Sequence, residues 1–171
     1  AYEISECLVV SEMCIRDRHN CAAVHLIEAD NSSYLCSDRK DSTYIYMKNI
    51  AETYWKRKKM PIPHLLLSDY EGRNVWSHKG IVHWRGMNIC MVTDGYWRNK
   101  SATNLLDIDY MYLCKGYKGE IAPLQKLFHI KRIVLDASLG DYKSKAYKEE
   151  CKTLGLDYID ISEKGSFRIL L

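Results

Sequence analysis

The chain has no hydrophobic run that approaches the roughly 18–20 residues needed to cross a bilayer. None of its seven cysteines forms a C-x-x-C pair, and several lie in apolar, strand-like runs. This pattern predicts buried free thiols rather than a disulfide framework or a zinc cluster, and it favours a reducing compartment. The cysteines are Cys7, Cys14, Cys21, Cys36, Cys90, Cys114 and Cys151.

Two signatures of hydrolases are also missing. The chain contains no H-x-H-x-D-H cluster of metal ligands and no G-x-S-x-G nucleophile motif. Ser138 follows Asp136 closely, but no histidine is placed by sequence to act as its base, so we expect it to cap a helix. These absences argue against both zinc-dependent and serine-dependent hydrolysis.

The composition is that of an ordinary globular protein. Hydrophobic residues make up 47% of the 171 residues, which is enough for one domain with a sizeable core. The formal net charge of +3 permits contact with nucleic acid or an acidic surface without requiring it.

The first eighteen residues need separate treatment. Cys7–Arg18 reads CLVVSEMCIRDR, which resembles translated adapter sequence at the ends of environmental (metagenomic) assemblies. We therefore expect residues 1–18 to be non-native, and the chain to be the carboxyl-terminal fragment of a longer protein. The alternative is an ordinary strand over CLVV followed by a polar loop.

The first half of the remaining chain predicts strands and one helix. Cys21–Ile27 and Tyr34–Cys36 form a hairpin around a turn-rich EADNSS stretch. A helix capped by Asp41 or Ser42 ends in the cations of Lys56–Lys59, which complement its macrodipole; nucleic-acid contact is the other interpretation of these cations. Further strands are expected over His64–Ser68, Asn74–Ser77, Ile81–Trp84 and Met87–Thr93, the last of them central because it is apolar on both faces.

Two histidines stand in this strand-rich part. His78 and His83 are five residues apart, which in a continuous strand places them on opposite faces. This spacing predicts that they do not share a metal ion.

The centre of the chain is a strand–loop–helix–strand unit. Asp109–Cys114 is a short apolar strand and Lys115–Gly119 is a loop with two glycines. Glu120–Phe128 has apolar residues at i, i+3, i+6 and i+7, which predicts a helix, and Arg132–Asp136 is the next strand. In an α/β fold, the loop at the end of such a strand is a common place for chemistry.

The tail predicts one more compact α/β segment. A helix over Tyr142–Leu154 is capped by Ser138 or Asp141, with Gly155 at its carboxyl end. Strands are expected over Tyr158–Ile161 and Ser166–Leu171.

Two aspartates end strands on the rim expected to carry Lys115. Asp94 and Asp136 together could bind a divalent ion. Aspartates after strands more often cap turns, and we favour that interpretation.

Five segments follow one another in a fixed order along the chain. They are AVHLIEADNSSYLCSD, ICMVTDG, DYMYLCKGYKGEIAPL, IKRIVLDASL and YKEECKTLGLDYIDISEKGSF. This ordered series resembles the metallo-β-lactamase-like carboxyl-terminal domain of the ComEC family, over about residues 19–171 and with no single diagnostic motif. Members of that family are membrane proteins that import DNA during natural transformation, and the Bacteroidetes-type members look most similar.

The resemblance implies a degenerate metal site. The positions of the metal ligands hold Lys115, Tyr117, Gly119 and Glu120, and only Glu120 could bind a metal. Cys114 precedes this loop, but one thiolate and one carboxylate are too few for zinc. We therefore expect an α/β, degenerate metallo-β-lactamase-like domain with mixed sheets and flanking helices, with no metal, no cofactor and no catalysis.

The resemblance further implies a role in DNA internalisation. A transmembrane channel of the same protein, in the bacterial inner membrane, is expected upstream of this chain. Cations on the loops that replace the metal site are candidate phosphate contacts, namely Arg98, Lys100, Lys115 and Lys118. One alternative is a metal-dependent phosphodiesterase or nuclease that uses Asp94, Glu120, Asp136 and a distant histidine. The other is an interaction domain that never contacts nucleic acid.

Overall fold

A computed structural model describes residues 6–9, 22–28, 33–37, 52, 55, 56, 59, 61–66, 69–164 and 167–170. The chain divides into two compact units, one formed by Ala1–Leu67 with Lys164–Leu171 and the other by Ser68–Glu163. The fold is α/β with mixed sheets, which confirms the predicted class. None of the helices in the described ranges has the length and apolar character needed to span a bilayer.

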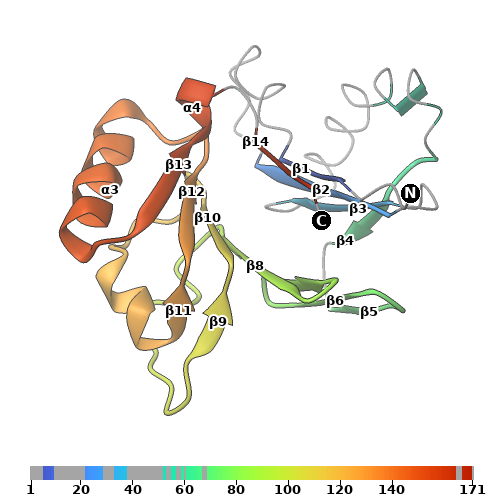
Figure 1. Ribbon diagram of the computed structural model, residues 1–171. Helices are drawn as coiled ribbons and strands as arrows, with labels where there is room; N and C mark the ends of the chain where they lie inside the picture. The colour runs from blue at the N-terminus through green and yellow to red at the C-terminus, as the bar shows by residue number, and fades with distance from the viewer. Residues whose placement is uncertain are drawn as a thin grey trace. The chain divides into compact units, whose positions relative to one another are not determined.

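The first unit contains a sheet whose described strands are β1 (Glu6–Val9), β2 (Ala23–Ile27), β3 (Ser33–Ser37), β4 (His64–Leu66) and β14 (Phe167–Leu170). Their order is β14-β1-β2-β3-β4, and only the β3–β4 pair is parallel (Figure 1). The antiparallel pairing of β2 with β3 confirms the predicted first hairpin.

Two predictions for the first unit are only partly covered by the described residues. The helix expected between Asp41 and Lys59 lies almost entirely outside them. Strand β1 covers Cys7–Val9, as in the alternative that CLVV is an ordinary strand. The non-native origin of residues 1–18 stays a prediction.

The second unit is organised on a seven-stranded sheet in the order β13-β12-β10-β8-β7-β6-β5 (Figure 1). Strands β5 to β8 are antiparallel neighbours, whereas β8, β10, β12 and β13 are parallel. Its strands are β5 (Tyr70–Glu71), β6 (Val75–His78), β7 (Ile81–Trp84), β8 (Met87–Val92), β10 (Tyr110–Leu113), β12 (Arg132–Leu135) and β13 (Asp157–Asp160). Strand β8 is central and largely buried, as its apolar sequence predicts.

One face of this sheet carries the main core of the unit. Helix α3 (Asp141–Leu154) packs beside β12 and β13, as Figure 1 shows. A small parallel sheet of β9 (Leu106–Ile108) and β11 (Phe128–Ile130) adds further apolar side chains. The buried cluster includes Cys90, Met111, Leu113, Ile121, Leu124, Phe128, Ile133, Leu135, Tyr147 and Cys151.

Four of the cysteines are buried and outside disulfides, as predicted. They are Cys36, Cys90, Cys114 and Cys151. Burial raises the pKa of Cys90 to about 12 and, with a smaller contribution from Glu150, that of Cys151 to about 11. Both thiols are therefore protonated and unreactive at neutral pH.

The helix predicted over Glu120–Phe128 is wrong in type and length. The structure has a 3₁₀-helix, η1 (Ala122–Lys126), and Phe128 begins strand β11. The spacing of the apolar residues in this segment is consistent with the 3₁₀-helix, because Ile121, Leu124 and Leu127 recur every three residues, which is the 3₁₀ period.

Helix α3 matches its predicted range, but its N-cap residue differs from the predicted one. Gly140 is the N-cap and no side chain caps the helix, so the predicted capping by Ser138 or Asp141 is wrong. Asp141 instead occupies the first turn, where its charge complements the helix dipole. Gly155 ends the helix in the left-handed conformation, as predicted.

The two histidines lie on one face rather than on opposite faces. A tight turn at Lys79-Gly80, with φ of 47° and 82°, separates β6 from β7. Because Trp76 pairs with His83 and lies two residues from His78, all three side chains share a face. The prediction failed because it treated the segment as one strand.

Candidate nucleic-acid interface

The loops that follow β8, β10, β12 and β13 meet at one edge of the second unit's sheet. These strands are parallel, and Val92 pairs with Leu113, which in turn pairs with Leu135. The residues that follow the strand ends therefore lie along this carboxyl edge. Asp94, Lys115 and Asp136 are three of them.

The degenerate-site loop, Cys114–Glu120, is fixed against the end of β8. The amide of Cys114 donates to the carbonyl of Val92, 3.2 Å away. At Gly116, a Cβ atom would lie 1.9 Å from the carbonyl oxygen of Thr93. Only glycine therefore permits this approach of the two backbones.

Tyr117 fills the interior of the degenerate-site loop. Its side chain is buried, and its hydroxyl donates to the carbonyl of Glu120 at 2.7 Å. The ring stacks on Tyr147 of α3, with 6.4 Å between centroids and 12° between planes. Burial is the main reason that the pKa of Tyr117 is raised; Glu150 and Glu120 add to the rise, and Arg98 opposes it. The interior of this loop is therefore filled by a packed phenol.

Helix α3 fastens the same loop from the other side. The Tyr147 hydroxyl contacts the carbonyls of Tyr117 and Gly119, at 3.2 and 3.0 Å. The ammonium of Lys143 donates to the Gly119 carbonyl at 3.0 Å. A carboxylate oxygen of Glu150 accepts from the amides of Ile121 and Ala122, at 2.7 and 2.8 Å. Both ends of the loop are therefore held by hydrogen bonds.

The two rim carboxylates, Asp94 and Asp136, each accept a hydrogen bond that stabilises the turn after a strand. Asp94 accepts from the Tyr96 amide at 2.8 Å, and Asp136 accepts from the Ser138 amide at 2.9 Å. Asp136 is buried and also accepts from the Tyr112 hydroxyl at 2.7 Å. Burial outweighs these hydrogen bonds and raises the pKa of Asp136. Across the described residues, no group of three or more His, Cys, Asp or Glu side chains converges on a point where a metal ion could bind.

A cluster of cations and aromatics stands on the loop after β8. The Lys100 ammonium lies 3.2 Å from the centroid of the Tyr96 ring, and the Lys79 ammonium lies 5.5 Å from the same centroid. Hydrogen bonds from both lysines lower the pKa of Tyr96. The neighbouring Trp97 packs edge-on against Tyr96 and Phe128, which anchors the cluster to the core.

The four predicted phosphate contacts are exposed and lie on two adjoining loops. Arg98 and Lys100 follow β8, whereas Lys115 and Lys118 belong to the degenerate-site loop. The close approach of Gly116 to Thr93 brings these loops together. The influence of Arg98 on the pKa of Tyr117 agrees with that proximity.

Sequence reasoning missed two members of the cluster, Lys79 and Tyr96. Tyr96–Lys100 reads YWRNK, in which two aromatics are followed closely by two cations, a pattern suited to nucleic-acid contact. That pattern could have identified Tyr96. No sequence signal indicates Lys79, which comes from the β6–β7 turn.

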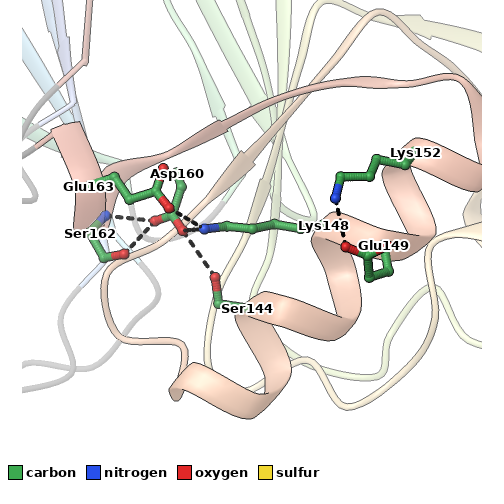
Figure 2. A network of polar contacts seen from close by, with 7 residues as sticks. All are labelled: Ser144, Lys148, Glu149, Lys152, Asp160, Ser162 and Glu163. Atoms are coloured by element: carbon green, nitrogen blue, oxygen red, sulfur yellow. Dashed lines mark hydrogen bonds and ion pairs between the residues drawn. The ribbon is translucent and has the colours of Figure 1, made fainter.

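A second polar network at the carboxyl edge was also missed. Asp160, which is 3% exposed at the end of β13, lies 2.5 Å from the Lys148 ammonium (Figure 2). It also accepts from the Ser144 hydroxyl and from the amide and hydroxyl of Ser162. Burial alone would raise the pKa of Asp160, but its hydrogen bonds, the largest from Lys148, lower it. The network ties α3 to α4 (Ile161–Lys164).

The fold and this edge define an α/β domain with a basic, aromatic rim beside a loop that is fastened to α3 by hydrogen bonds. A family model, the ComEC C-terminal domain, matches residues 13–171. The chain therefore belongs to the ComEC C-terminal domain family, which supports a role in a competence and DNA-uptake protein. Comparisons with curated proteins and with solved structures found no significant match.

Proposed function

We propose that this chain is a non-catalytic, DNA-contacting domain of a ComEC-like uptake protein, built on a degenerate metallo-β-lactamase-like fold. The observation that carries the proposal is the Tyr96 ring close to the ammonium groups of Lys100 and Lys79, next to a loop in which the packed phenol of Tyr117 holds one of the candidate ligand positions. In this proposal, the domain guides imported DNA for a transmembrane channel located upstream in the same protein, at the bacterial inner membrane.

The chemistry of the cluster fits DNA. Lysine and arginine supply phosphate contacts, and an exposed aromatic ring offers a surface on which bases stack. Tyr96 is 39% exposed, so part of its ring is accessible. Lys115 and Lys118 extend the positive charge along the neighbouring loop.

The residues of the degenerate-site loop support the proposal that the domain is not catalytic. Lys115 is a cation, Gly119 has no side chain, and the Tyr117 hydroxyl is already used within the loop. Glu120 is the one carboxylate among these four positions, and a metal site needs several converging ligands.

DNA binding of the whole chain, measured by fluorescence anisotropy at several salt concentrations, tests the proposal. We expect affinity to fall as salt rises, since phosphate contacts release counterions. Lys100→Ala, Lys115→Ala and Lys118→Ala should each weaken binding and reduce the salt slope by about one. Lys145→Ala, an exposed lysine on α3, is the matched control. Equal affinities in all four variants would contradict the proposal.

Metal analysis of the same preparation distinguishes the alternatives. Stoichiometric zinc or manganese would favour the phosphodiesterase or nuclease. A folded protein without DNA binding at low salt would favour the interaction domain.

A further inference from the structure

The β5–β8 end of the second unit's sheet carries a cross-strand row of four side chains. Glu71 pairs with Trp76, Trp76 with His83, and His83 with Asn88. Directly paired residues of antiparallel strands share a face, so the four side chains stand side by side. Trp76 is 42% exposed, so its indole presents an accessible aromatic surface.

A pocket of about 410 Å³ lies at this row. Its other walls come from the β5–β6 and β7–β8 turns, which are linked by the Arg85 amide and the Asn74 carbonyl at 3.4 Å. Arg73 and Arg85 are exposed and line the pocket. Its lining therefore carries two positively charged guanidinium groups and one negatively charged carboxylate, that of Glu71. The volume suits a small ligand, and the charge favours an anion.

His83 has a defined orientation in this pocket. The Asn88 side-chain amide donates to the Asp107 carbonyl at 2.8 Å, so its oxygen faces His83. The His83 Nδ1 atom, 2.7 Å from that oxygen, must therefore donate. In neutral His83 this leaves Nε2 as a hydrogen-bond acceptor.

We propose that this pocket binds a nucleotide, with its base against Trp76 and its phosphate between Arg73 and Arg85. The base edge meets two acceptors, Glu71 and His83, which suit a base with an exocyclic amine. The pocket does not depend on the carboxyl-edge loops, so the inference stands apart from the proposed function. A free nucleotide and a nucleotide unit of a DNA strand share this chemistry.

Calorimetric titration of the whole chain with dAMP, deoxyadenosine and inorganic phosphate tests the pocket. We expect dAMP to bind more tightly than deoxyadenosine alone or inorganic phosphate alone. Trp76→Ala should weaken dAMP at least about fivefold, and Trp76→Tyr should restore much of the loss. Arg73→Ala or Arg85→Ala should weaken dAMP roughly three- to tenfold and leave deoxyadenosine unchanged. Unchanged dAMP affinity in Trp76→Ala, or no dAMP binding by the parent chain, would overturn the proposal.

The control variant and the comparisons with other nucleotides use the same calorimetric titration. Tyr142→Ala removes an aromatic residue that is 87% exposed on α3, and it should leave dAMP binding intact. We expect dCMP to bind several-fold more tightly than dTMP, and equal affinities would overturn the role of Glu71 and His83. If Trp76→Ala also weakens binding of a short oligo-dA, the pocket takes a strand unit. If it weakens only dAMP, the pocket takes the free nucleotide.

Discussion

The hydroxyl of Tyr147 lies 3.0 Å from the carbonyl oxygen of Gly119, while its ring lies parallel to that of Tyr117. One helix side chain thus satisfies the backbone of the degenerate-site loop and packs against its interior. Through Tyr117, this loop is part of the packed core of the unit.

Removing this hydroxyl should loosen the loop. Tyr147→Phe keeps the stacked ring but leaves buried carbonyls with fewer donors, so we expect a loss of about 1–2 kcal/mol in the free energy of unfolding. Urea denaturation of Tyr147→Phe beside Tyr142→Phe measures the effect, since Tyr142 is exposed. An unchanged midpoint in both variants would show that the hydroxyl contributes nothing.

Gly116 should tolerate no side chain. In Gly116→Ala the new Cβ would meet the Thr93 carbonyl at 1.9 Å, so the two loops must separate. We expect destabilisation of about 2–3 kcal/mol by thermal or urea unfolding. Gly95→Ala is the control, because nothing lies within 4 Å of its added Cβ. Equal stabilities of the two variants would refute the close approach.

The buried network around Asp160 should contribute more to the free energy of unfolding than the surface ion pair between Lys152 and Glu149, which is drawn beside it in Figure 2. Lys148→Met leaves a buried carboxylate without its cation, and we expect a loss of about 2–3 kcal/mol. Lys152→Met, which breaks an exposed pair with Glu149, should cost less than about 0.5 kcal/mol. Chemical denaturation at neutral pH compares them, and similar losses would contradict this ranking.

The same pair of variants gives a pH test. The pKa of Asp160 is lowered in the folded protein, so its stabilisation is complete above the ordinary carboxyl pKa of about 4. The stabilisation disappears as pH falls through the folded value. The gap between the parent and Lys148→Met should therefore narrow in strong acid, and a constant gap would contradict the assignment.

Asp136 should have the opposite pH dependence. Burial raises its pKa in the folded state, so the folded protein binds this proton more tightly than the unfolded chain does. Its contribution to stability therefore increases as pH falls from neutrality towards about 4. The parent should gain stability relative to Asp136→Asn over that range. Denaturation curves at several pH values check this, and a flat difference would exclude the raised pKa.

Local pattern predicted much of the second unit. The apolar runs at Met87–Val92, Tyr110–Leu113 and Arg132–Leu135 became neighbouring parallel strands, and the 3.6-residue period before Gly155 became α3. These elements are buried on at least one continuous face, so their sequence period follows directly from their geometry.

The rest depends on contacts between residues distant in sequence. No local pattern places Lys148 against Asp160, or the Tyr147 hydroxyl at Gly119, because tertiary packing brings these pairs together. The row from Glu71 to Asn88 was missed for a different reason. It follows from hairpin register, and that register was lost when the turn at Lys79 was treated as continuous strand.

The seven-stranded sheet has a further consequence for biosynthesis. From β5 to β13, every strand pairs with the sheet strand that precedes it in the chain. The ribosome therefore releases the strands in the order in which the sheet adds them, and no later strand must insert between two earlier ones. A nascent chain paused after β10 would already hold five adjacent strands. It would also expose β10, with its apolar residues Met111 and Leu113, as a temporary open edge, which is the stage at which a chaperone would be most useful.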